Sequence, residues 1–137
     1  MDVLITPGPL KGTVTPPPSK SIAHRAILAA ALAGGGTISN LAASQDIEAT
    51  RRCIAALKAE GPDLPLLDCG ESGSTLRFLI PLALVLRGDG IFTGRGRLME
   101  RPQKPYFDIF DEKGIFYEQK DGVLTVRGHL EPGEYRL

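Results

Sequence analysis

Apolar residues gather along the chain in blocks that short polar or glycine-rich segments interrupt. Two blocks, 26–36 and 78–86, are almost entirely apolar. The block boundaries predict helices, because a serine precedes each of the first three candidates and a glycine follows all four. The predicted helices cover about residues 20–33, 45–60, 73–86 and 102–113. Pro81 falls inside the third helix, where it is expected to kink or locally unwind it.

Seven short segments outside these helices have the composition of strands. They cover residues 3–6, 13–15, 37–40, 66–68, 90–93, 115–119 and 123–127. Asp121-Gly122 separates the last two, and this dipeptide is typical of a two-residue β-hairpin turn. The chain is therefore expected to form an α/β fold with a hairpin over residues 115–127.

The second half of the chain is similar to the first when the sequence is shifted by 53 residues. Each half then reads helix, strand, helix and glycine. We interpret residues 1–61 and 62–137 as two copies of one supersecondary unit, with a chance match as the alternative. The hairpin belongs to the second copy alone, since residues 61–65 are too few for one. The matched positions are Ser19 with Ser72, Ile38 with Ile91, Ile54 with Phe107, Leu57 with Phe110, and Gly61 with Gly114.

Composition and charge argue against several classes of function. The 137 residues include 16 basic and 16 acidic side chains, and this zero net charge argues against non-specific nucleic-acid binding. No apolar run reaches the length of a membrane span and no secretory signal is visible, so a cytoplasmic protein is expected. Cys53 and Cys69 lack the spacing of metal ligands and are expected to be free thiols. With only two histidines, no metal site is predicted.

The first predicted helix carries its charges at the end where they are least favourable. Lys20 and Arg25 lie in its first turns, although a helix N-terminus is the positive end of the helix dipole. A bound anion would remove this conflict, because the free backbone N–H groups and both cations would point at it. Ser21 and Arg25 share one face of the helix. The alternative is a solvated helix end, with His24 as a hydrogen-bonding partner.

Two further segments could bind anions. The third predicted helix begins Ser72-Gly73-Ser74, small residues that let a ligand approach the backbone, and Arg77 follows one turn later. The segment 95–102 carries three arginines, which can hold phosphate or carboxylate groups bidentately. The alternatives are a serine-capped helix and a solvated loop. The two helix starts, related by the repeat, together favour a site for anionic ligands.

These motifs resemble those of the 5-enolpyruvylshikimate-3-phosphate synthase family, also called the 3-phosphoshikimate 1-carboxyvinyltransferases. Residues 18–25 resemble the family's N-terminal signature, 72–77 its second and 100–102 its third, in the same order and spacing. The resemblance implies an inverse-repeat α/β fold with two lobes, each holding three copies of a helix-and-sheet unit. This chain would hold about two of the six copies, both in one lobe, and would be an N-terminal fragment.

The resemblance also implies a reaction, namely transfer of the enolpyruvyl group of phosphoenolpyruvate to the 5-hydroxyl of shikimate 3-phosphate. Phosphate is released, no cofactor is needed, and the product serves aromatic amino acid biosynthesis. By the family motifs, Lys20, Ser21 and Arg25 would bind shikimate 3-phosphate. Lys20, Gly73 and Arg101 would bind phosphoenolpyruvate, and Lys20 would also be the catalytic cation. The supporting candidates are Ser74, Arg77 and Arg97.

The chain departs from the family pattern in three places. The family's Ser-Ser-Gln segment and its general acid and base carboxylates would belong to sequence beyond this chain, including a missing C-terminal lobe. This chain alone is therefore expected to be inactive. Residues 61–66 lack the family's hairpin, and Phe78 stands where many members carry proline. Three alternatives remain open: a related enolpyruvyl transferase acting on a UDP-sugar, a non-catalytic anion-binding module, and a degenerate structural fragment.

Overall fold

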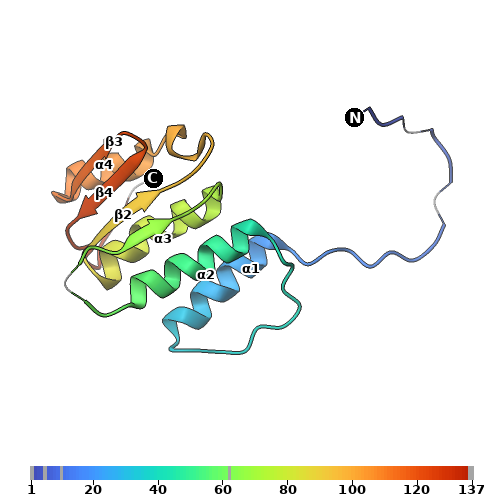
Figure 1. Ribbon diagram of the computed structural model, residues 1–137, viewed down its shortest axis with the longest axis horizontal. Coiled ribbons are helices and arrows are strands. Elements are labelled where there is room, and N and C mark those ends of the chain that lie inside the picture. Colours follow the sequence, from blue (N-terminus) through green and yellow to red (C-terminus); the bar gives the residue numbers. More distant parts are fainter. Residues whose placement is uncertain (1, 5, 10, 62, 136–137) are drawn as a thin grey trace.

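The computed structural model describes residues 2–4, 6–9, 11–61 and 63–135 (Figure 1). All four predicted helices are confirmed, with ends within two residues of the predicted bounds. The helices are α1 Lys20–Leu32, α2 Gln45–Lys58, α3 Gly73–Leu86 and α4 Lys104–Lys113, and a short 3-10 helix covers Leu98–Glu100. The strands are β1 Leu66–Asp68, β2 Asp89–Thr93, β3 Phe116–Lys120 and β4 Val123–Arg127.

Serine side chains cap the first three helices, as predicted. Each serine oxygen accepts a hydrogen bond from the backbone N–H three residues later, and so satisfies a donor that a helix start leaves unpaired. The pairs are Ser19 with Ile22 at 3.4 Å, Ser44 with Ile47 at 3.2 Å, and Ser72 with Thr75 at 3.2 Å.

α3 stays helical through Pro81, so the expected local unwinding does not occur. Proline lacks an N–H, and the carbonyl oxygen of Arg77, four residues earlier, therefore loses its helical partner. The hydroxyl of Tyr106 on α4 donates to that oxygen at 2.7 Å. Burial raises the pKa of Tyr106, which keeps the hydroxyl protonated as a donor. A side chain of α4 thus replaces the missing backbone donor.

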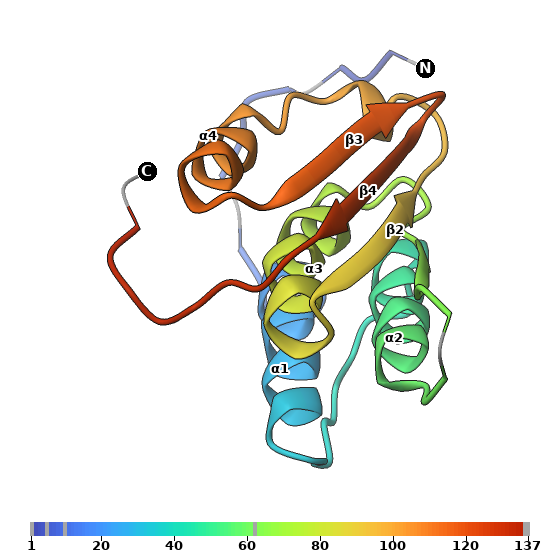
Figure 2. The ribbon, with the colours of Figure 1, turned by 90° about the vertical axis from the view of Figure 1, so that its left-hand side faces the viewer.

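The four strands form one mixed sheet in the order β1-β2-β4-β3. β1 and β2 are parallel and joined through α3, whereas β4 is antiparallel to both β2 and β3. The predicted hairpin is confirmed, and Asp121 and Gly122 have positive φ angles of 51° and 75°, as a tight turn of this kind requires. In Figure 2 the strands lie in front of the helices, so one face of the sheet packs against a helical layer.

The main core lies between this sheet and α3. Phe92, Leu124 and Val126 alternate along β2 and β4 and are fully buried against the apolar face of α3. A second, smaller cluster joins α1 to α2 through Ala23, Ile27 and Ile47. α1 also reaches the main core through Leu28, so it has fewer apolar contacts there than α3.

Three predicted strands, 3–6, 13–15 and 37–40, are not formed in the part of the chain that the structure describes, and Ile5 lies outside that part. In the second half, β2 lies between β1 and the hairpin strand β4. Shifted back by 53 residues, β1 corresponds to 13–15 and β2 to 36–40, which includes the predicted strand 37–40. Only residues 59–65, however, separate α2 from β1. No hairpin strand can therefore pair with 37–40, and two short strands alone are too weak to persist.

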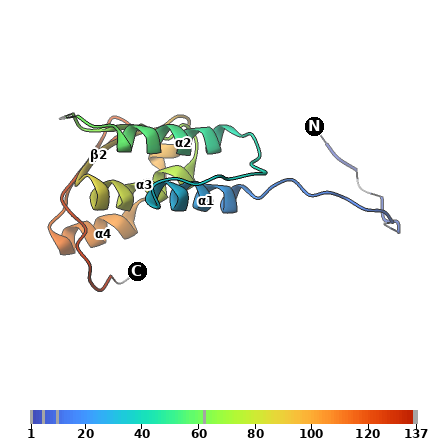
Figure 3. The ribbon, with the colours of Figure 1, turned by 90° about the horizontal axis from the view of Figure 1, so that it is seen from below.

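The first half thus contributes α1 and α2 without a sheet. These helices lie beside α3 (Figure 3), and residues 11–19, before α1, run away from all three (Figure 1). The division into repeat units 1–61 and 62–137 stays a prediction. Cys53 and Cys69 are free and buried, as expected. Among the described residues, no helix has the length and apolar character needed to cross a membrane.

Replacing Tyr106 by phenylalanine is expected to lower the free energy of unfolding by about 1 kcal/mol, because the Arg77 carbonyl would lose its donor. In a Pro81→Ala background the same substitution is expected to cost much less, since residue 81 would then supply its own N–H. Denaturant unfolding of the two single variants and the double variant measures this coupling. Equal losses in both backgrounds would contradict the explanation.

Candidate functional site

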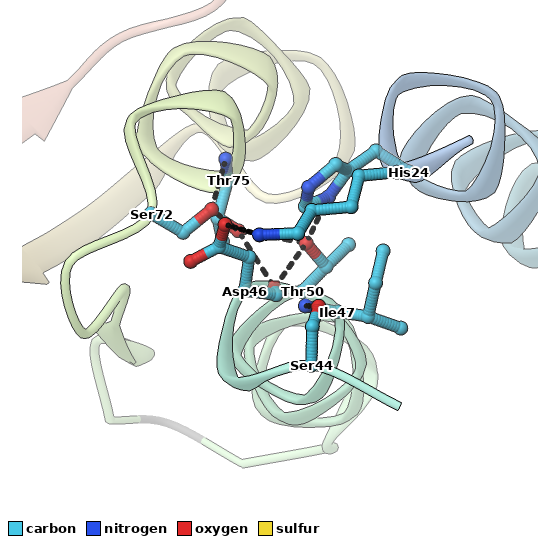
Figure 4. A network of polar contacts seen from close by, with 8 residues as sticks. His24, Ser44, Asp46, Ile47, Thr50, Ser72 and Thr75 are labelled. Atoms are coloured by element: carbon cyan, nitrogen blue, oxygen red, sulfur yellow. Dashed lines mark hydrogen bonds and ion pairs between the residues drawn. The ribbon is translucent and has the colours of Figure 1, made fainter. Parts of the chain in front are cut away.

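The N-termini of α1, α2 and α3 converge at one end of the helical layer. Lys20 Nζ contacts Asp46 Oδ2 at 3.1 Å, and His24 Nδ1 lies 2.7 Å from Thr50 Oγ1. Each pair joins α1 to α2, and the two contacts lie one turn apart on both helices, so these helices run parallel. Thr50 Oγ1 in turn lies 2.7 Å from Oγ1 of Thr75, in the first turn of α3. The three N-termini therefore meet around one group of polar side chains (Figure 4).

The α1 N-terminus presents the three residues predicted to bind shikimate 3-phosphate. The Lys20 side chain is 57% exposed despite its contact with Asp46. Arg25 Nη1 donates to the Ser21 carbonyl oxygen at 2.9 Å, and the guanidinium carbon lies 5.2 Å from the centre of the Phe78 ring. This cation–π contact ties the α1 cations to α3. We refer to Lys20, Ser21 and Arg25 as the α1 cluster.

The N-terminus of α3 brings together Gly73 and Arg101, both predicted to bind phosphoenolpyruvate. A Cβ atom placed on Gly73 would lie 2.6 Å from Arg101 Nη1, so the guanidinium packs directly against the glycine. Any side chain at this position would displace Arg101. Gln103 Nε2 donates to the Arg101 carbonyl oxygen at 3.3 Å and so holds the backbone of this arginine. The helix N-terminus and the guanidinium together suit a carboxylate or phosphate group.

The loop that carries Arg101 is attached to the loop before α3 by the backbone. The N–H of Arg95 donates to the Gly70 carbonyl oxygen at 2.7 Å, and a Cβ on Gly94 would lie 3.0 Å from that same oxygen. Arg95 also contacts Asp68 at 3.6 Å. Both loops follow the carboxyl ends of the parallel strands β1 and β2, the edge at which α/β sheets commonly bind ligands. Arg95 therefore has a structural partner within the loop scaffold.

A buried line of hydrogen bonds connects the three helices, and we call it the polar chain: His24, Thr50, Thr75 and Ser72. Its successive contacts, His24 to Thr50, Thr50 to Thr75 and Thr75 to Ser72, are each 2.7 Å long. All four residues are at most 3% exposed. Their polar groups are satisfied by one another, as buried polar groups require. His24 is thus a hydrogen-bonding partner within the fold.

The environment of His24 favours its neutral form. Burial is the main cause of a lowered His24 pKa, and the positive charges of Lys20 and Arg25 act in the same direction. The Asp46 carboxylate on α2 acts in the opposite direction and is outweighed. A neutral imidazole at physiological pH leaves the positive charge of this region on Lys20, Arg25 and Arg101.

The supporting candidates are less closely tied to these groups. Arg97 is 89% exposed and pairs with Glu100 of its own loop at 3.0 Å, and Ser74 and Arg77 are exposed on α3. Arg77 takes part in the fold through its carbonyl oxygen, which accepts from Tyr106. Roles in binding for Ser74, Arg77 and Arg97 stay predictions.

Sequence reasoning missed Asp46, Thr50 and Thr75 as parts of this region. An acidic residue in the first turn of a helix, such as Asp46, is favourable for its own helix dipole, so nothing near it in sequence indicates that its carboxylate contacts Lys20. The spacing of these residues could have indicated the link. Lys20 and His24 are four residues apart, as are Asp46 and Thr50, so in two parallel helices Lys20 can face Asp46 while His24 faces Thr50. Among the described residues, no group of histidine, cysteine, aspartate and glutamate side chains could hold a metal ion.

Acidification is expected to destabilise the fold through His24. The folded chain resists protonation of this imidazole, whereas the unfolded chain takes up the proton near pH 6.5. Stability should therefore fall as the pH decreases below about 6.5, by at most about 1.4 kcal/mol per pH unit from this residue. Denaturant unfolding at several pH values measures the slope. His24→Asn should flatten it, and the exposed His129, replaced by asparagine, serves as control; an unchanged slope in His24→Asn would contradict the assignment.

Comparisons with known proteins agree with the fold and the motifs. The sequence profile of EPSP synthase (3-phosphoshikimate 1-carboxyvinyltransferase) matches residues 4–134. A protein of that name from Clostridium beijerinckii is 42% identical over 97% of this chain, and one from Clostridium perfringens is 41% identical over 98%. The chain spans 37% of the length of each. A solved EPSP synthase from Acinetobacter baumannii shares the fold, with a TM-score of 0.65 and 20% identity over 85% of this chain and 32% of that one.

Most of this fold is therefore shared with part of a known structure. The extent of the profile match and the identity to the clostridial proteins lead to one assignment. The chain belongs to the EPSP synthase family.

Proposed function

We propose that this chain forms one part of the active site of an enolpyruvyl transferase. In this proposal, shikimate 3-phosphate and phosphoenolpyruvate bind at the converging N-termini of α1 and α3. The observation that carries it is the packing of Arg101 against Gly73, next to an α1 terminus that bears two cations. The names of the clostridial relatives, 3-phosphoshikimate 1-carboxyvinyltransferase, support the choice of reaction.

The proposed ligands match the chemistry of the two helix starts. Shikimate 3-phosphate carries a carboxylate and a phosphate, and the α1 cluster offers an ammonium, a guanidinium and a hydroxyl. Phosphoenolpyruvate carries the same two anionic groups, and the free N–H groups near Gly73 and the guanidinium of Arg101 suit either. The proposal has Lys20 contact both ligands; in support, His24, one turn after Lys20, is linked to the first turn of α3 through the polar chain.

In the proposed reaction, the methylene carbon of phosphoenolpyruvate gains a proton while the 5-hydroxyl oxygen of shikimate 3-phosphate bonds to C2 and loses its proton. Phosphate then leaves this tetrahedral intermediate, and a proton departs from the methyl group to restore the double bond. Lys20 and Arg101 would stabilise the negative charge held on the phosphate and carboxylate groups through these steps. Without substrate, Asp46 keeps the Lys20 ammonium partnered.

In this proposal the present chain binds the substrates, and residues outside the matched part transfer the protons. The chain spans 37% of the C. beijerinckii relative, and the proton-transferring carboxylates would belong to sequence outside the matched part. This chain alone is then expected to bind without turning over. A non-catalytic anion-binding module is the second candidate, and it is favoured by the same cations if no turnover occurs in any longer form of the protein.

Lys20→Ala is expected to weaken binding of both ligands about tenfold, since one charge-assisted contact to each is lost. NMR titration of the isotope-labelled chain with shikimate 3-phosphate, alone and then with phosphoenolpyruvate, measures the affinities. The amide signals of Ser21, Arg25 and Gly73 should shift and saturate in the unsubstituted chain.

Lys104→Ala is the matched control for this titration. Lys104 is likewise an exposed lysine paired with a carboxylate, Asp108, but it lies on α4. Equal losses in the two variants would indicate non-specific charge attraction, and a well-dispersed spectrum without shifts would refute the proposed function. Tighter binding of a UDP-sugar than of shikimate 3-phosphate would favour the related transferase.

Gly73→Ala is expected to reduce the affinity for phosphoenolpyruvate several-fold with little change in stability. The new Cβ would displace Arg101 Nη1 from its place 2.6 Å away, but this arginine is exposed and can move aside. Phosphoenolpyruvate titration and thermal unfolding separate the two effects. Gly133→Ala is the control, because nothing lies closer than 4.0 Å to a Cβ there; an unchanged affinity in Gly73→Ala would rule out Arg101 as a ligand in this position.

A further inference from the structure

The polar chain is almost completely buried between α1, α2 and α3. The proposed reaction uses Lys20, Gly73 and Arg101 but none of its four residues. Yet the polar chain ends on Ser72, whose oxygen accepts the Thr75 N–H and caps α3 directly before Gly73. Its other end, His24, lies one turn after Lys20 on α1. The polar chain therefore connects the two places where anions are proposed to bind.

The hydrogen bonds of the polar chain can be ordered from one end. Thr75 Oγ1 donates to Ser72 Oγ at 2.7 Å, which uses the single hydroxyl proton of Thr75. Both threonine hydroxyls also lie near the Asp46 carbonyl oxygen, Thr50 Oγ1 at 3.2 Å and Thr75 Oγ1 at 3.4 Å, but the 2.7 Å contact between the two threonine oxygens is shorter and assigns the Thr50 proton to Thr75. Thr50 has no further proton for its 2.7 Å contact with His24, so the imidazole must donate from Nδ1. Donation thus runs from His24 through Thr50 and Thr75 to Ser72.

This order of donors requires residue 24 to donate a hydrogen bond to Thr50. The side chain must offer an N–H at the Nδ1 position, which a neutral imidazole supplies only in one of its two tautomers. An asparagine amide can offer a donor at about the same place, whereas a leucine of similar shape cannot. Without that donor, the buried Thr50 oxygen would lack one of its partners, and α1 would lose its hydrogen-bonded link to the first turn of α3.

We propose that His24 is a positioning residue of the site: as the Nδ1–H donor of the polar chain, it fixes Lys20 relative to Gly73 so that both can hold one anion. The inference rests on the proposed function for the identity of that anion, phosphoenolpyruvate. Its structural content, the tautomer and the coupling of the two helix starts, is independent of any ligand.

The test compares two variants that differ in the donor alone, His24→Asn and His24→Leu. Without ligand, the ring-nitrogen NMR spectrum of the unsubstituted chain should show the proton on Nδ1. The Gly73 amide signal should stay in place in the Asn variant and move in the Leu variant. With shikimate 3-phosphate present, the phosphoenolpyruvate affinity should fall about five- to tenfold in the Leu variant and less than about threefold in the Asn variant.

Two controls separate positioning from stability. Ile47→Val shortens a buried side chain that packs with α1 and should lower the unfolding temperature without changing the affinity. If His24→Leu does not fold, Thr75→Val and Thr75→Ser replace the pair, since serine keeps the hydroxyl and valine removes it.

The measurements distinguish failure of the positioning role of His24 from failure of the proposed function. A proton on Nε2, or equal behaviour of the donor-keeping and donor-free variants, would overturn the inference. If the unsubstituted chain binds neither ligand, the proposed function fails, and the ligand-free signals of Gly73 and of the His24 ring still decide the inference.

Discussion

Three helix N-termini that meet at one place repel one another, because each carries a partial positive charge. In this chain Lys20 and Arg25 add to that charge, and the Asp46 carboxylate, 3.1 Å from Lys20, offsets only part of it. The polar chain holds the three helix starts together against this repulsion through short, buried hydrogen bonds. The polar chain therefore holds the positively charged helix starts, with Lys20 and Arg25, at one place that suits an anion. The sheet and the apolar core hold the helices in this position.

The two halves of the chain contribute to this arrangement unequally. The second half forms a complete unit, in which the sheet and α3 enclose the main core. The first half contributes α1 and α2, and α1 is attached by a small apolar cluster, by Leu28 in the main core, by the contacts at its N-terminus, and by Lys58, which donates to the Ala31 carbonyl oxygen at the other end. Polar contacts thus add to the apolar ones that hold α1, the helix that carries Lys20.

Local signals in the sequence predicted much of the fold. The capping serines, the bounds of α3 and the Asp121-Gly122 turn depend on neighbouring residues, and the structure agrees with each. The failures involve distant partners: residues 37–40 have strand composition but no strand beside them, and Pro81 is tolerated because of Tyr106. For the site, helix electrostatics pointed to the N-termini of α1 and α3. The buried link between them needed the packing of α2, which periodicity alone does not define.

A crystal structure of this chain with shikimate 3-phosphate and phosphoenolpyruvate would show whether one anion lies between the N-termini of α1 and α3. We expect a carboxylate or phosphate group within hydrogen-bond distance of the Lys20 ammonium, the Gly73 backbone and the Arg101 guanidinium, with the polar chain unchanged. Ligands bound elsewhere on a chain folded as described, or Lys20 still paired with Asp46 beside an empty α3 N-terminus, would contradict this expectation.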